Sequence, residues 1–222
     1  MYRIPQLVNL IPMNSVYRLL NALQYSLLPT RCVLCQNPGM TRLDLCSACV
    51  EDMPRASNPK KTPHGQLFSG FSYQAPLDEL IQGFKFNEHL HYGRMLARLS
   101  LTELPRIKPM ALIAVPLHKT RLRQRGFNQA QVLANFWGKQ LAVPVLGNVL
   151  HRHRATQVQS SLKAAERLPN VSGAFIARGE IPAHVALIDD VYTTGATCTS
   201  AAQALIAHGV QRVDVWCLAR VL

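Results

Sequence analysis

Thirteen consecutive residues, from Val185 to Thr197, constrain the fold of this chain more than any other segment. They read V-A-L-I-D-D-V-Y-T-T-G-A-T, an apolar run followed by two carboxylates and a threonine-rich loop around one glycine. A short apolar run rich in β-branched residues is typical of a strand buried on both faces of a parallel sheet. Small and apolar residues over 196–207 predict a helix after the loop, and 210–216 predict the next strand. The segment therefore predicts a β-loop-α-β unit.

The loop of this unit has the composition of a phosphate site. In such units the ligand lies beyond the carboxyl end of the strand, where the start of the helix offers backbone N–H groups and a positive dipole end. Gly195 allows the backbone to approach an anion closely, and Thr193, Thr194 and Thr197 add hydroxyl donors. Together with Ala196, these residues predict a cradle for one phosphate group.

Two adjacent carboxylates, Asp189 and Asp190, lie between the strand and this loop. Both cannot be buried without partners, so ligand hydroxyl groups, a divalent cation or both would explain them at the end of a strand. That combination describes a ribose phosphate with magnesium. The alternative is an ordinary helix cap and turn, which also use Asp, Thr and Gly.

The segment 185–197 resembles, without a departure, the motif that binds phosphoribosyl pyrophosphate in type I phosphoribosyltransferases. Further segments resemble the ComF family of competence proteins, also called the GntX type, and the resemblance runs from about Cys32 to the carboxyl terminus. These segments are Val115 to Lys119, Arg121, Arg123, Arg125 to Ala130, Gln157, Leu162, Glu166-Arg167, Asn170 to Phe175 and an amino-terminal set of four cysteines.

The resemblance implies an α/β protein with the type I phosphoribosyltransferase fold, in which helices flank a mainly parallel central sheet, preceded by a small four-cysteine zinc module. It implies a protein that binds phosphoribosyl pyrophosphate with magnesium and handles single-stranded DNA during natural transformation, with a competence helicase as a partner. The alternative is a working phosphoribosyltransferase of nucleotide or amide-nitrogen metabolism, whose acceptor no feature of the sequence identifies.

The resemblance also assigns roles to residues. Asp189 and Asp190 would hold the ribose hydroxyl groups, and one of them would act as the catalytic acid or base if the site is an enzyme's. Residues 193–197 would hold the 5′-phosphate. Magnesium would bridge the diphosphate and the ribose hydroxyl groups, while Lys119, Arg121 and Arg125 would neutralise the charge of the diphosphate.

The cysteines form two matched pairs, Cys32-x-x-Cys35 and Cys46-x-x-Cys49. This spacing predicts one tetrahedral zinc ion, and because four thiolates fill every position, the zinc would be structural. Disulfides are the alternative, which a reducing compartment disfavours. Cys198 and Cys217 stand apart; we expect both to be small buried side chains, although the start of a helix could acidify the thiol of Cys198.

Positive charge is concentrated between His118 and Arg167, where nine Lys or Arg residues face Glu166 alone. This segment has a net charge of +8, of a total of +12. Such a field attracts polyanions, and a diphosphate and a nucleic-acid backbone are the two candidates, with a solvated basic surface as the alternative. The candidate nucleic-acid residues are Arg121, Arg123, Arg125, Arg152, Arg154 and Arg167.

Composition and periodicity suggest four parts: an amphipathic helical leader over 1–31, the zinc module over 32–56, a linker over 57–66 and the transferase-like domain over 67–222. Within the last part we expect strands at 67–73 and 111–115, helices at 77–86, 89–100 and 127–141, and a mobile loop at 152–165. No transmembrane span and no signal peptide are expected, which favours the cytoplasm, with peripheral attachment to the inner membrane through a DNA-uptake complex.

Overall fold

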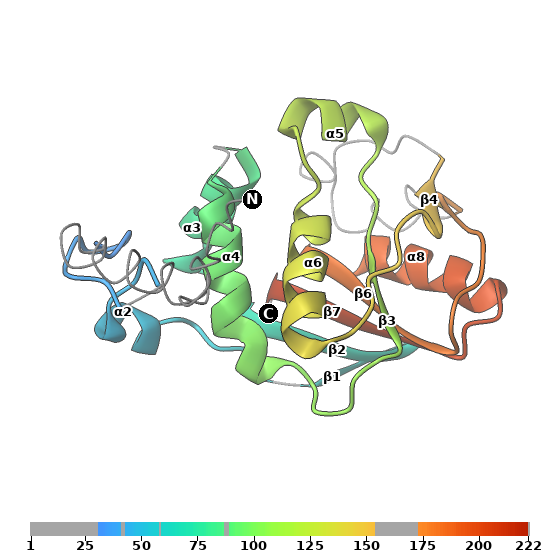
Figure 1. Cartoon of the computed structure of the whole chain (residues 1–222), viewed down its shortest axis with the longest axis horizontal. Coiled ribbons are helices and arrows are strands. Elements are labelled where there is room, and N and C mark those ends of the chain that lie inside the picture. The colour runs from blue at the N-terminus through green and yellow to red at the C-terminus, as the bar shows by residue number, and fades with distance from the viewer. Residues whose placement is uncertain (1–30, 41–42, 58, 87–88, 154–172, 222) are drawn as a thin grey trace, which may run out of the picture. The chain divides into compact units, whose positions relative to one another are not determined.

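The computed structural model describes residues 31–40, 43–57, 59–86, 89–153 and 173–221, and the chain divides into two compact units after Asp52 (Figure 1). The predicted helical leader lies outside the described residues, except for Arg31. So does most of the loop expected over 152–165. No helix of the described ranges is long and apolar enough to cross a bilayer.

The first unit holds the two cysteine pairs on short turns. The N–H group of Cys32 donates to the carbonyl of Asn37 at 2.8 Å, and that of Gln36 donates to the carbonyl of Cys32 at 2.9 Å, which closes the first turn. The second pair begins helix α2 (Ser47–Glu51), where the sulfur of Cys46 accepts from the N–H group of Cys49 at 3.5 Å. Backbone turns thus bring each pair of thiols together.

The second unit is built on one five-stranded sheet. Its strands occur in the order β1 (Lys60–Thr62), β2 (Gly65–Ser72), β7 (Arg212–Arg220), β6 (His184–Tyr192) and β3 (Ala111–Ala114). Neighbouring strands are parallel except β1, which pairs with β2 in the antiparallel direction. The predicted class, a mainly parallel sheet flanked by helices, is confirmed. The segment 57–66, for which composition suggests a linker, contains β1.

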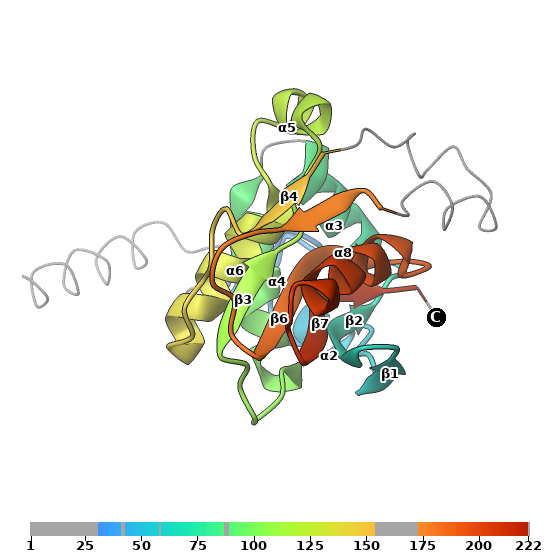
Figure 2. The same cartoon turned by 90° about the vertical axis from the view of Figure 1, so that its right-hand side faces the viewer.

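Helices cover both faces of this sheet (Figures 1 and 2). One face carries α8 (Ala196–Ala207) and the separate hairpin of β4 (Leu150–Arg152) and β5 (Phe175–Ala177). The other face carries α6 (Gln129–Leu141), on which α4 (Leu90–Leu99) packs, followed by α3 (Leu77–Phe86). The remaining elements are the 3-10 helix η1 (Ser100–Glu103) and the short helix α5 (Lys119–Arg125).

Strand β6 lies in the middle of the core. All four residues from Val185 to Ile188 are fully buried, as the apolar run predicts for a strand covered on both faces. Val185 and Leu187 belong to the apolar cluster that includes α8. On the neighbouring strand, the ring of Trp216 lies 6.4 Å from that of Trp137 of α6, edge to face.

The strands of the sheet differ in length at their carboxyl ends, and this creates a gap. Pairing of β3 with β6 stops at Ala114 and Ile188, whereas β6 continues to pair with β7 as far as Tyr192 and Arg220. Asp189 and Asp190 are therefore strand residues rather than loop residues, because β7 still pairs with this part of β6. Their other side lacks the β3 neighbour and is open to side chains from elsewhere.

The opposite, amino-terminal end of β6 is fixed by a buried carboxylate. Asp214, only 1% exposed, accepts from the backbone N–H of Gln66 at 2.8 Å and lies 2.8 Å from Nε2 of His184 and 3.1 Å from Nη2 of Arg212. These contacts join β2, β6 and β7. A buried charge with this many partners holds the register of the strands.

Candidate functional site

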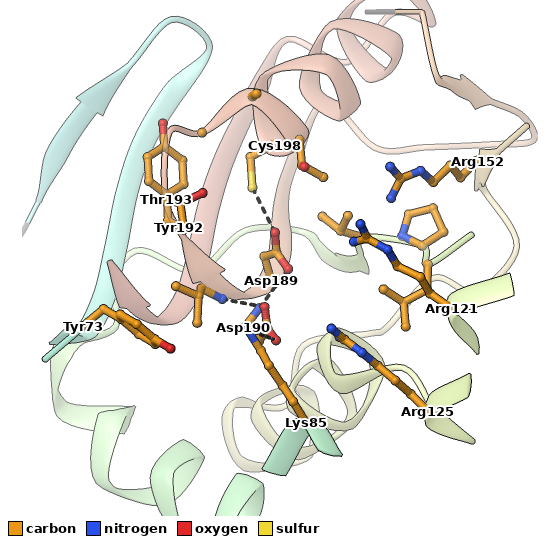
Figure 3. Close-up of a pocket in the computed structure, with 17 residues that line it drawn as sticks. Tyr73, Lys85, Arg121, Arg125, Arg152, Asp189, Asp190, Tyr192, Thr193 and Cys198 are labelled. Atoms are coloured by element: carbon orange, nitrogen blue, oxygen red, sulfur yellow. Dashed lines mark hydrogen bonds and ion pairs between the residues drawn. The ribbon is translucent and has the colours of Figure 1, made fainter. Parts of the chain in front are cut away.

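A cavity of about 230 Å³ opens beyond the carboxyl ends of β3 and β6, close to the smallest volumes that hold ligands (~300–1,000 Å³) (Figure 3). Its lining combines carboxylates, cations and the threonine-rich loop. The polar members and the cysteine are Tyr73, Lys85, Arg121, Arg125, Arg152, Asp189, Asp190, Tyr192, Thr193, Thr197 and Cys198. The cavity thus lies where the β-loop-α-β pattern predicts a ligand.

The two carboxylates point toward different helices because successive side chains of a strand alternate between its faces. Asp189 faces α8, where the thiol of Cys198 donates to its Oδ2 at 3.6 Å. Asp190 faces α3, where Nζ of Lys85 lies 2.9 Å from its Oδ2 (Figure 3). One pair of adjacent residues therefore connects the helices on both faces of the sheet.

The carboxyl group of Asp189 is harder to ionise than an ordinary one. Burial, and then the negative charge of Asp190, raise its pKa to about 7, against the lowering effects of its hydrogen bonds and of Lys85. At neutral pH this carboxyl group is therefore present in both its protonated and its ionised form. A ligand that brings positive charge or hydroxyl donors would favour the ionised form.

The threonine-rich loop turns at Gly195, which begins α8. Its φ of 77° lies in the left-handed region, and an added Cβ would overlap the hydroxyl of Tyr192, so a larger residue here would be strained. Gly195 has no side chain to cap the helix, while Oγ1 of Thr194 accepts from the N–H group of Ala196 at 3.5 Å. Thr193, Gly195, Ala196 and Thr197 line the cavity, whereas Thr194 does not.

Three arginines lie on the side of the cavity opposite this loop (Figure 3). Arg121 and Arg125 come from α5 and Arg152 from β4. Burial, and then the charge of Arg125, lower the pKa of Arg121; burial, and then the charge of Arg121, lower the pKa of Arg152. Like charges held this close favour the binding of an anion with several negative oxygens.

The arginines on α5 are positioned by their spacing and by two amide side chains, of which that of Gln129 is buried. Arg121 and Arg125 are four residues apart and so share one face of the helix. The Nη1 of Arg125 donates to the amide oxygen of Gln129 at 3.2 Å, and Gln129 is only 1% exposed. Asn128 caps α6 and donates to the carbonyl of Val115 at 3.0 Å, which ties α6 to the end of β3.

The structure separates the predicted site residues into two groups. Lys119 and Arg123, expected at the diphosphate and at nucleic acid respectively, are exposed on α5 and are not among the residues that line the cavity. Arg121 and Arg125, expected both at the diphosphate and at nucleic acid, line the cavity, and so does Arg152, expected at nucleic acid. Arg154 and Arg167 lie outside the described residues.

Two residues of the cavity, Lys85 and Tyr73, were not predicted to be there. Lys85 lies between Phe84 and Phe86 in the sequence, and Phe84 is fully buried. The signal that could have identified Lys85 is a single cation in the last turn of a helix whose other charged residues, Asp78 and Glu79, lie in its first turn. Its carboxylate partner is distant in the sequence, so local patterns do not reveal it.

The four cysteines of the first unit form a separate site. Their sulfur atoms all lie within 4.8 Å of one another, and those of Cys35 and Cys46 are 3.5 Å apart. Zn–S bonds of about 2.3 Å at tetrahedral angles require S···S distances near 3.8 Å, so the four thiols fit one zinc ion. Although burial opposes it, hydrogen bonds with the backbone at Cys35, Cys46 and Leu34 lower the pKa of Cys32 to about 6, which favours the thiolate.

The other two cysteines are buried, as predicted. Burial raises the pKa of Cys198 well above its usual value, with the charge of Asp189 as the next cause. Burial also raises that of Cys217. The start of α8 therefore does not acidify Cys198, because loss of solvation outweighs the helix dipole.

Comparison with known proteins agrees with both units. Residues 23–61 match the double zinc ribbon domain. Competence protein F of Haemophilus influenzae is 38% identical over 159 residues, which cover 67% of this chain and 69% of that protein. DNA utilization protein YhgH of Salmonella typhimurium is 33% identical over 207 residues, 86% of this chain and 90% of that protein. Competence protein ComFC of Streptococcus pneumoniae is 30% identical over 184 residues, which cover 82% of this chain and 80% of that protein.

The zinc site predicts a stoichiometry. The purified chain should hold one zinc per molecule by elemental analysis, and Cys46→Ser should lose most of it, because three thiolates bind zinc less tightly than four. Cys198→Ser, which changes a cysteine of the other unit, should keep the full amount. Zinc retained by Cys46→Ser would contradict this ligand set.

The raised pKa of Asp189 predicts a pH-dependent stability. Because the folded state binds this proton more tightly than the unfolded chain, the contribution of Asp189 to the free energy of unfolding should fall as pH rises from about 4 to about 7. Asp189→Asn removes this effect because its side chain is neutral at every pH. At pH 8 the variant should melt at a higher temperature than the wild type, by ~2–4 °C for each kcal/mol of unfolding free energy gained. At pH 4 it should not melt at a higher temperature.

A matched control for this experiment is Glu180→Gln, which alters an exposed carboxyl group of the same unit. Its melting temperature should follow that of the wild type at both pH values. A difference between wild type and Asp189→Asn that does not change from pH 4 to pH 8 would contradict the raised pKa.

Proposed function

Because the chain belongs to the ComF family of competence proteins, we propose that it binds phosphoribosyl pyrophosphate with magnesium and handles single-stranded DNA taken up by the cell. Relatives named competence protein and DNA utilization protein support the role in DNA uptake. The observation that supports the ligand is the order of groups in Figure 3: the threonine-rich loop at Thr193, then the two carboxylates, then the group of arginines.

This order matches the order of groups in phosphoribosyl pyrophosphate, which are the 5′-phosphate, the ribose and the diphosphate. The backbone of 193–197 would bind the 5′-phosphate at the start of α8, where N–H groups and the helix dipole favour an anion. Asp189 and Asp190 would accept from the ribose hydroxyl groups. Arg121 and Arg125 would bind the diphosphate with their forked donors.

The same residues fit magnesium held together with the ligand. Magnesium prefers oxygen ligands, and the cavity is lined by two carboxylates, Asp189 and Asp190. When bound, magnesium would neutralise part of the diphosphate charge. The carboxylates of this chain would then orient the ribose, and the arginines would hold the remaining negative charge.

Single-stranded DNA would bind outside this cavity. Lys119 and Arg123 are four residues apart on α5, on the face that does not line the cavity, and both are exposed. The chain as a whole carries a net charge of +12, which favours a polyanion. We place the protein in the cytoplasm, at the inner membrane through a DNA-uptake complex, with a competence helicase as its partner.

The alternative is an active phosphoribosyltransferase. The carboxyl of Asp189, with its pKa of about 7, favours it, because an acid or base works best when its pKa is close to the operating pH. Release of pyrophosphate from phosphoribosyl pyrophosphate in the presence of one particular nitrogenous acceptor would support this reading.

Two glycines offer a matched test of the ligand site. Gly195→Ala should weaken binding of magnesium phosphoribosyl pyrophosphate at least ~100-fold in calorimetric titration, because the new side chain strains the phosphate loop. Gly147→Ala should bind like the wild type, since no atom lies within 4 Å of its added Cβ. Asp190→Asn leaves the loop unchanged and should also bind magnesium phosphoribosyl pyrophosphate less tightly, because it removes a carboxylate that would hold the ribose hydroxyl groups. Failure of the folded wild type to bind would contradict the proposal.

Salt dependence tests the DNA-binding surface. Lys119→Ala with Arg123→Ala should weaken binding of an oligothymidylate and reduce the slope of log affinity against log salt by about 1.4, because each single-strand phosphate contact contributes about 0.7. Lys60→Ala with Lys61→Ala removes two exposed charges from β1 and should leave the slope nearly unchanged. Equal slopes for both double variants would contradict a specific surface on α5.

A further inference from the structure

Lys85 lines the cavity, and the sequence motifs assign it no role there. Its ammonium lies 2.9 Å from Oδ2 of Asp190, and the two side chains are only 18% and 13% exposed. Figure 3 shows the lysine reaching from α3 to the carboxylate across the floor of the cavity. Without a ligand, Lys85 therefore neutralises the group that the ribose hydroxyl groups or the cation would need.

The backbone of Lys85 is fixed, but its side chain can turn. Phe84 is fully buried against Phe127, with ring centres 5.7 Å apart, and the amide nitrogen of Gln129 donates to the carbonyl of Lys85 at 3.4 Å. The lysine side chain carries a compact charge on four flexible carbon atoms. Its ammonium can therefore change partners by a rotation of the side chain, with no shift of α3.

The new partner lies on the arginine side of the cavity. Gln129, which binds the backbone of Lys85, also accepts from Arg125 through its amide oxygen at 3.2 Å. One buried amide thus holds the two cationic residues next to each other, and Figure 3 shows both pointing into the same part of the cavity. An anion bound by Arg125 would lie within the range of Lys85.

The charges of the lining show what such an exchange needs. Among the described residues, four cations (Lys85, Arg121, Arg125 and Arg152) and two carboxylates line the cavity. Moving Lys85 away from Asp190 breaks this ion pair and leaves the carboxylate close to Asp189, with the charge of Arg121 as a more distant offset. The move is therefore favourable only when a ligand brings both a partner for Asp190 and an anion for Lys85.

We propose that Lys85 is a specificity-determining residue that pairs with Asp190 in the free protein and with the diphosphate of the ligand in the complex. This inference rests on the proposed function. A ribose phosphate with a diphosphate supplies partners for both groups at once. Ribose 5-phosphate must displace Lys85 from Asp190 and offers it no new anion. Lys85 thereby selects for the diphosphate and blocks the carboxylates against smaller ligands and free cations.

Calorimetric titration of two ligands into the wild type and Lys85→Met tests this selection. Met is unbranched, keeps most of the length of the lysine side chain and removes its charge. With magnesium present, Lys85→Met should lose about tenfold or more in affinity for phosphoribosyl pyrophosphate and keep or gain affinity for ribose 5-phosphate. Lys139→Met, an exposed lysine of α6, should change neither. An equal loss for both ligands, or no loss for either, would overturn the proposal.

A second readout needs no sugar phosphate. Mn²⁺ alone, followed by electron paramagnetic resonance, should bind Lys85→Met about tenfold or more tightly than the wild type, because the variant leaves both carboxylates to the cation. Equal Mn²⁺ affinity in the two proteins would overturn the blocking role of Lys85. If the folded wild type binds neither sugar phosphate, the proposed function fails, and the Mn²⁺ comparison still decides whether Lys85 blocks the carboxylates.

Discussion

The pair of adjacent carboxylates at the end of β6 is the constraint on which the rest of the cavity depends. Two like charges on neighbouring residues raise the cost of ionising either, and burial raises it further for Asp189. If these two side chains were uncharged, they would not need charged or hydrogen-bonding partners around them. The thiol of Cys198, the ammonium of Lys85 and the neighbouring arginines are partners that make this pair tolerable.

The sheet makes this arrangement possible through the unequal length of its strands. Because β3 ends opposite Ile188 while β7 continues, the carboxylates remain on a rigid strand and yet have one open side. The chain after β3 forms α5, whose arginines Arg121 and Arg125 line the rim of that opening. The amide side chains of Asn128 and Gln129 at the start of α6 hold this rim to the sheet and to α3. The family motif around Asn128 and Gln129 is therefore a scaffold for the charged residues.

Features fixed by neighbouring residues were predictable from the sequence. The buried strand 185–188, the turn at Gly195, the helix after it and the two cysteine pairs each follow from local composition and spacing. Features fixed by packing between distant segments were not. Lys85 reaches Asp190 only because α3 packs near the end of β6, and β1 forms because a polar segment can pair with the edge of a sheet. Helix α5 lacks an apolar stripe. Its sequence therefore does not distinguish the arginines that line the cavity from the basic residues that face outward.

A crystal structure of the protein grown with phosphoribosyl pyrophosphate and magnesium tests the central claim most directly. The account predicts the 5′-phosphate on the backbone of 193–197, the ribose hydroxyl groups on Asp189 and Asp190, and the diphosphate beside Arg121 and Arg125. Ordered ligand bound at another surface, with Lys85 still paired to Asp190 and the cavity empty, would contradict it.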